Sequence, residues 1–195
     1  MRCGIPLRTL GLALILIGTT AIPTHGQECY LARGDMAAAK ERPSPLMETV
    51  ITLGGQEAKV CYGSPSVKGR TIFGELEEFG QPWRLGANEA TALHLPFAAE
   101  VGGIDLEPGS YSLFAIPGEA EWEIFVNSTF ERWGIPLNDE VTAANVGSFT
   151  RPTAATGDLV EQLTFRWEAH GEDMGHLVME WENTRVEVPI RKGGM

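Results

Sequence analysis

The sequence predicts an all-β protein, built as a single antiparallel β-sandwich or jelly-roll-like domain. Short β-prone runs recur along the chain, and turn signals separate them at intervals of roughly 8 to 12 residues. Several runs alternate apolar with polar residues, as a strand with one buried face requires. No helical pattern is long enough to supply the crossover connections of a parallel α/β fold. A length of 195 residues with 43% apolar content is typical of one domain with a substantial core.

The first residues, 1–26, have the pattern of a signal peptide. Two arginines precede the apolar run Leu10–Ile17, and small residues at Thr24-His25-Gly26 form a cleavage site. The apolar run is shorter than the ~20 residues that a membrane-spanning helix needs, so an uncleaved anchor is the weaker interpretation. We expect cleavage near Gly26 and export of the mature chain to the periplasm or the medium.

The charge balance excludes one class of partner. Removal of residues 1–26 takes away two arginines and no acidic residue, so the net charge moves from −11 to −13. Such a surface repels the phosphates of nucleic acids. We therefore expect no nucleic-acid partner, and no later apolar segment is long enough to span a membrane. The sequence leaves the oligomeric state open.

Residues 27–43 form a leader segment to the domain. Asp35 is placed to cap a short helix, Met36–Arg42, which Pro43 ends. The mature chain keeps Cys29 and Cys61, and an exported protein meets an oxidising compartment. A bridge between these cysteines would contribute roughly 3 to 4 kcal/mol by the chain-entropy model. Two buried thiols are the alternative, because the spacing does not fix the distance between them.

The β domain is expected to span residues 44–191 and to open with a hairpin. Val50–Leu53 and Ala58–Tyr62 are β-prone runs joined across Gly54-Gly55, which is a hairpin signal. A connection rich in glycine and proline then extends over residues 64–82. Long irregular connections inside compact domains are often functional, so this region is the first place to expect a site.

The remaining strands follow in sequence order, with a second irregular region predicted over Asn127–Pro152 and a last turn at Asn183-Thr184. The predicted strands are Thr91–Leu95, Ile104–Leu106, Ser110–Ile116, Trp122–Asn127, Leu159–Glu168, His176–Trp181 and Arg185–Ile190.

A dense polar stretch, Trp83–Thr91, leads from the irregular connection into the next strand. A guanidinium at Arg84 can hold a carboxylate or phosphate through two parallel hydrogen bonds. Asn88 offers both a donor and an acceptor, and Trp83 offers a flat face for stacking. We predict a pocket for a small polar or anionic ligand, lined by Arg70, Trp83, Arg84, Asn88, Glu89 and Thr91.

Two other interpretations of this stretch stay open. In the first, the protein is a hydrolase of envelope glycans or small esters that uses Glu89 as acid or base. That chemistry needs a second carboxylate, which the acidic loop 75–78 would supply by folding back. In the second, Arg84, Asn88 and Glu89 only satisfy buried backbone groups and hold the connection onto the sheet.

We predict no metal and no cofactor. His170 and His176 flank the run Gly171–Gly175, which contains two acidic residues, but a polar hairpin loop explains the same residues. The chain has no phosphate-binding or dinucleotide-binding fingerprint. It also has no serine in a nucleophile elbow, so the sequence does not decide whether the protein catalyses a reaction.

Four segments together carry a family resemblance: Arg42–Pro45, Pro65–Gly74, Trp83–Thr91 and Pro108–Pro117. With these segments, and with Trp122, Asn127 and Trp133-Gly134 in the expected order, the chain resembles the bacterial family of domain of unknown function 2911 from about Arg42 to Ile190. The resemblance implies an exported protein with one β-rich domain, and it brings no established activity, cofactor or catalytic residue. Leu85 stands where the family pattern has threonine, so a hydroxyl there is not essential.

Overall fold

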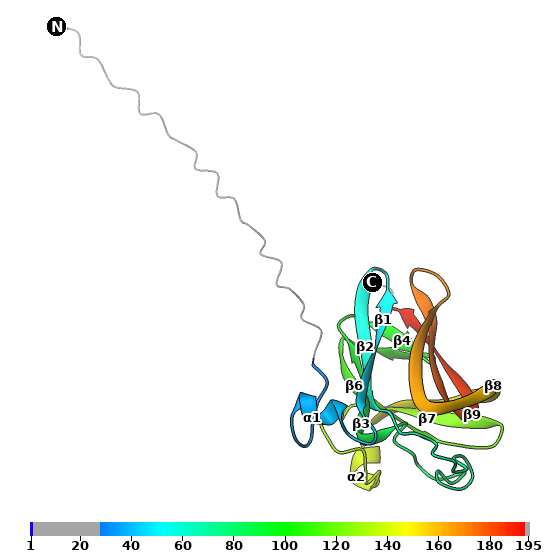
Figure 1. Ribbon diagram of the computed structural model, residues 1–195. Coiled ribbons are helices and arrows are strands. Elements are labelled where there is room, and N and C mark those ends of the chain that lie inside the picture. Colours follow the sequence, from blue (N-terminus) through cyan, green and yellow to red (C-terminus); the bar gives the residue numbers. More distant parts are fainter. Residues whose placement is uncertain (2–27, 194–195) are drawn as a thin grey trace.

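The structure, a computed structural model, describes residues 28–193 together with Met1, so the predicted signal peptide lies outside the described residues apart from Met1. Nine strands form one sheet in the order β1-β2-β3-β6-β7-β8-β9-β4-β5, and every pair is antiparallel (Figure 1). The prediction of an antiparallel all-β protein is therefore confirmed. The elements are α1 (Met36–Lys40), β1 (Leu46–Leu53), β2 (Gln56–Gly63), β3 (Ala87–Leu95), β4 (Ala99–Val101), β5 (Ile104–Leu106), β6 (Gly109–Ile116), β7 (Glu121–Asn127), α2 (Asp139–Thr142), β8 (Asn145–Ala169) and β9 (Met174–Lys192).

The first hairpin forms as the sequence predicts. Leu53 pairs with Gln56 across Gly54-Gly55, and these two glycines have φ of 53° and 71°. Positive φ at two adjacent positions is the backbone of a tight hairpin turn, and glycine adopts it without strain. Between this hairpin and β3, no helix forms in the irregular connection, which contains only turns, bends and isolated bridges.

The prediction of an irregular region over Asn127–Pro152 is wrong for residues 145–152, about the last third. β8 begins at Asn145 and pairs with β7, so that Phe149 faces Ile124. In this part of β8, half-buried residues alternate with exposed residues, but few of the side chains are apolar. The sequence therefore lacks the alternation of apolar and polar residues that predicts a strand. The segment becomes a strand because the backbone of β7 supplies hydrogen-bond partners along its length. This is a tertiary effect that cannot be predicted from the local sequence.

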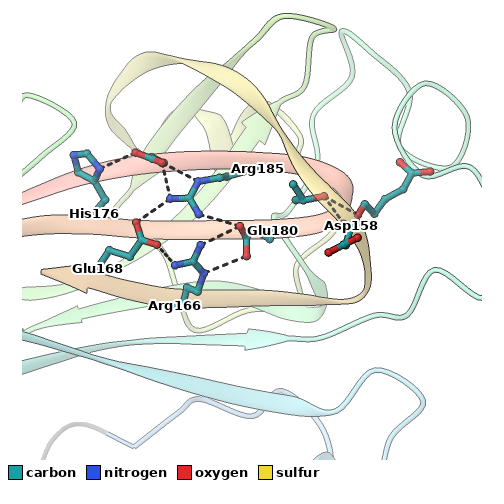
Figure 2. Close-up of polar contacts among 9 residues, drawn as sticks. Asp158, Arg166, Glu168, His176, Glu180 and Arg185 are labelled. Carbon is teal, nitrogen blue, oxygen red and sulfur yellow. Dashed lines mark hydrogen bonds and ion pairs between the residues drawn. The ribbon is translucent and has the colours of Figure 1, made fainter.

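β9 turns back on itself near Glu182, whose φ is 56°. Nδ1 of His176 lies 2.8 Å from Oε2 of Glu187, although a straight strand would place residues this far apart in sequence about 36 Å from each other. β8 bends round the outside of this turn and pairs with both arms of β9, as Figure 2 shows. The change of direction lies beside the predicted last turn at Asn183-Thr184.

The sheet curls across the core so that its β1–β2 end lies against β8 and β9, where Thr49 Oγ1 donates to Phe165 O at 2.6 Å. The chain that follows β2 is hydrogen-bonded to the middle of β8: Ser64 Oγ donates to Leu163 O at 2.6 Å, and Val67 N donates to Glu161 O at 2.7 Å. Three tryptophans and one phenylalanine from four different parts of the chain meet inside the curl, as described below for Trp83. The core is therefore enclosed by one sheet and by the irregular connection.

The leader segment is fixed to this sheet. Oδ1 of Asp35 accepts a hydrogen bond from Ala38 N at 2.9 Å, which confirms the predicted cap, but α1 ends at Lys40 rather than at the predicted Arg42. Cys29 and Cys61 form a disulfide, with their Cα atoms 5.7 Å apart, so of the two interpretations left open the bridge is confirmed. Within residues 28–193, no helix has the length and apolar character to cross a membrane.

Candidate functional site

The structure distributes the six predicted pocket residues over three environments. Trp83 lies in the core, whereas Asn88, Glu89 and Thr91 bind other parts of the same chain. Arg70 and Arg84 lie close to an acidic residue of the irregular connection. Within residues 28–193, the contacts of these side chains place them in separate surroundings.

Trp83 is 3% exposed and packs among other aromatic rings. Its ring stacks on Trp181, with centroids 5.8 Å apart, and meets Trp122 and Phe73 edge to face at 5.6 Å and 5.5 Å. Its backbone N and O both pair with Ala115 of β6, which fixes the irregular connection to the sheet. The flat face of Trp83 is thus already in contact with protein.

Glu89 holds the leader segment. Its carboxylate is 5% exposed and forms an ion pair of 2.8 Å with Arg42, and it accepts a hydrogen bond of 3.2 Å from Ala32 N. Next to it, Nδ2 of Asn88 donates to Ser44 O at 2.9 Å. The residues at both ends of α1 are therefore tied to the start of β3.

These contacts bear on the hydrolase interpretation. A general acid or base must reach a substrate proton, and the pair of carboxylates in a glycosidase must face each other. Within residues 28–193, the carboxylate of Glu89 is hydrogen-bonded to a guanidinium and to a backbone amide, and not to a second carboxylate or an imidazole. Thr91 likewise donates its hydroxyl to Leu85 O at 2.8 Å. The arrangement favours the structural interpretation for Asn88, Glu89 and Thr91.

The positive charges of Arg70 and Arg84 interact with the carboxyl of Glu77. Glu77 belongs to the acidic loop 75–78, the predicted source of a second carboxylate in the hydrolase interpretation. Burial raises the pKa of Glu77 to about 7, while the positive charges of Arg84 and Arg70 oppose that rise. Burial also lowers the pKa of Arg84, whose Nε donates to Gly86 O at 3.2 Å. Nη1 of Arg84 is buried and has no hydrogen-bond partner among the described residues.

Replacing Glu77 by glutamine should change how stability depends on pH. A carboxyl whose folded pKa is raised contributes stability that is complete below about pH 4.5 and is lost as the pH rises through 7. We expect Glu77→Gln to be more stable than the wild type by about 1 to 2 kcal/mol at pH 8, after discounting for solvent screening, and equally stable at pH 4.5. Urea denaturation at both pH values measures this difference. Parallel profiles, or the same effect from the exposed neighbour Glu75→Gln, would contradict the prediction.

A groove lies between the leader segment and the first hairpin, away from the predicted pocket. Its volume is about 510 Å³, within the ~300 to 1,000 Å³ of sites for small ligands. Four apolar or sulfur-bearing side chains and four charged side chains line it: Cys29, Met36, Leu46, Met47, Glu28, Lys40, Glu48 and Lys59. Sequence reasoning missed this groove because it exists only when the disulfide and Glu89 hold the leader segment against β1.

The charges in the groove are partly paired. Nζ of Lys59 lies 3.2 Å from Oε2 of Glu48, so these two charges neutralise each other. Lys40, at the end of α1, has no ion pair among the described residues, and Met36 and Met47 present flexible apolar surface beside it. Glu28 adds one negative charge to the lining. The groove therefore combines an apolar surface with one unpaired cation.

A second polar constellation covers the outer face of β8 and β9 (Figure 2). Arg185 is at its centre, and its guanidinium contacts Glu168 at 2.8 Å, Glu180 at 2.9 Å and Glu187 at 2.6 Å. Arg166 joins Glu168 and Glu180 from the neighbouring strand. We call these five residues, with His176, the charged array.

Hydrogen bonds within the charged array lower the pKa of two of its acids, Glu180 and Glu187. The hydrogen bond from Arg166, followed by that from Arg185, lowers the pKa of Glu180, and the hydrogen bond from Arg185, followed by that from His176, lowers the pKa of Glu187. The sequence contains a signal for this array, since the charged residues alternate with buried apolar residues on each strand. This pattern predicts the array only when β9 is known to turn back at Glu182.

The fold and these sites define an antiparallel all-β protein whose leader segment is attached by a disulfide and an ion pair. The chain belongs to the family described as protein of unknown function (DUF2911), whose model matches residues 44–190. That match confirms the resemblance seen in the sequence and covers the strands from β1 almost to the end of β9. No curated protein and no solved structure matches the chain.

Proposed function

We propose that the protein is an exported binding module whose groove, between the leader segment and β1–β2, takes a small amphipathic anion. The observation that carries this proposal is the lining of the groove, where apolar side chains lie beside Lys40, which has no ion pair among the described residues. An apolar chain would pack on Met36, Leu46 and Met47, and a carboxylate or phosphate would meet the ammonium of Lys40.

The disulfide supports export, because such bridges persist in oxidising compartments. It also supports binding, since Cys29 is part of the lining and its bond to Cys61 fixes one wall of the groove. A wall held before the ligand arrives lowers the entropy cost of binding. The hydrolase alternative lacks such support, because Glu89 faces a guanidinium rather than the groove.

The test uses protein purified from the periplasm of the cells that produce it. We expect its intact mass to match that of a chain beginning at Gln27. Calorimetric titration compares decanoate, below its critical micelle concentration, with the uncharged decanol, below its solubility limit. We expect decanoate to bind more tightly, because only decanoate can pair with Lys40. The variants Lys40→Glu and Met47→Asp should each weaken decanoate binding roughly tenfold or more, a loss of about 1.4 kcal/mol.

Two matched controls lie outside the groove. Lys68→Glu reverses the charge of another exposed lysine, and Val146→Asp replaces an apolar side chain that is 45% exposed, against 44% for Met47. Both controls should bind decanoate as the wild type does. The proposal fails if neither probe binds, or if the control variants lose affinity as much as the groove variants do.

A further inference from the structure

The hairpin between β8 and β9 brings two imidazoles together. The ring centroids of His170 and His176 are 4.4 Å apart, with the ring planes at 68°. His170 N donates to Met174 O at 2.9 Å, which closes the hairpin. His176 is paired with Glu168, so the two histidines are diagonal neighbours across the hairpin. The separation is small enough for one ion to contact both rings after rotation of the exposed His170 side chain.

Glu187 orients the second of these imidazoles. Its Oε2 lies 2.8 Å from Nδ1 of His176, and Arg185 holds the other carboxylate oxygen. A carboxylate on Nδ1 favours the tautomer with its proton on that nitrogen, and the lone pair then lies on Nε2. Histidines that bind metals in proteins usually have this kind of partner on the opposite nitrogen.

We propose that His170 and His176 form a binding site for a divalent transition metal such as Zn²⁺, with Glu187 as the positioning residue and water completing the coordination. Imidazole nitrogen is a preferred ligand of such ions. The site is independent of the groove and goes beyond the proposed function. It also departs from the expectation drawn from the sequence, which could not show the ring separation or the contact with Glu187.

Other donor groups compare poorly with this pair. Among the described residues, the group of three donors within 4.8 Å of one another consists of Cys29, Glu48 and Cys61. Its two sulfur atoms are bonded to each other and cannot act as thiolates. His94 is 3% exposed, so its imidazole is closed to an ion from solvent.

The test is a zinc titration of the mature protein without a polyhistidine tag. We expect one zinc ion per chain by calorimetry, with the imidazole NMR signals of His170 and His176 shifting while those of His94 stay unchanged. His170→Asn and His176→Asn should each abolish binding. Glu187→Gln should weaken binding about tenfold while both imidazole signals still respond, because it removes only the orienting partner.

Glu123→Gln is the matched control, since this glutamate accepts a hydrogen bond from Ser148 on a different part of the sheet. It should bind zinc as the wild type does. Urea denaturation of each variant shows that a lost signal does not come from unfolding. The inference is overturned if a large excess of zinc gives no binding, or if either histidine variant binds as tightly as the wild type.

Discussion

Replacing Trp83 by alanine is expected to lower the free energy of unfolding by about 4 kcal/mol, as large aromatic-to-alanine changes in cores do. The ring is 3% exposed and contacts Trp122, Trp181 and Phe73, so its removal leaves a cavity between side chains that come from distant parts of the chain. The cavity cannot close easily because the backbone at Trp83 stays paired with Ala115.

Two variants make this experiment specific. Trp83→Phe keeps an aromatic ring. Nε1 of Trp83 has no hydrogen-bond partner among the described residues, so the substitution leaves no acceptor unsatisfied. It should lower the free energy of unfolding by only about 1 to 2 kcal/mol. Trp133→Ala removes a half-buried ring whose contact is the Arg33 guanidinium at 4.7 Å, and it should cost about 1 kcal/mol. Urea denaturation followed by far-ultraviolet circular dichroism measures all three. A loss below about 1 kcal/mol for Trp83→Ala would mean that this ring is not a core element.

The fold follows from the sequence wherever one strand carries its own pattern. Val50–Leu53 alternates between exposed and buried residues, Ala58–Tyr62 is β-prone, and both runs flank two glycines, so local rules suffice for the first hairpin. The start of β8 has no such pattern and depends on the row of partners that β7 provides. Both arms of β9 carry strand patterns in the sequence, but the contact between the arms, such as that from His176 to Glu187, depends on the turn at Glu182, where a non-glycine residue takes a positive φ.

The predicted pocket shows why chemistry of single residues is a weak guide to a site. A tryptophan, an arginine and a glutamate within one short stretch of sequence suggest a ligand. Yet Trp83 packs in the core, whereas Glu89 binds the leader segment. The position of each side chain depends on a contact with a residue that is distant in sequence, Trp181 for Trp83 and Arg42 for Glu89. The groove and the histidine pair depend in the same way on the disulfide and on the bend of β9.

Replacing Glu89 by glutamine should lower the free energy of unfolding by about 2 to 3 kcal/mol. The substitution keeps the shape of the side chain but removes the charge that faces Arg42, whose guanidinium donates to both carboxylate oxygens, at 3.1 Å and 2.8 Å. Removing one partner of a fully buried ion pair costs about 3 to 5 kcal/mol. We expect less here, because the side chain of Arg42 remains 19% exposed and water can solvate part of its charge.

A double-mutant cycle with Arg42→Met separates the ion pair from other effects of each change, and a coupling of about 2 kcal/mol is expected. Because Glu89 also accepts from Ala32 N, Glu89→Gln should speed amide hydrogen exchange in α1 while leaving β6 and β7 protected. It should weaken decanoate binding as well, since Met36 and Lys40 reach the groove only while the leader segment is held against the sheet. Unchanged stability with lost decanoate binding would instead place Glu89 in direct contact with the ligand, and the structural role given to it here would be wrong.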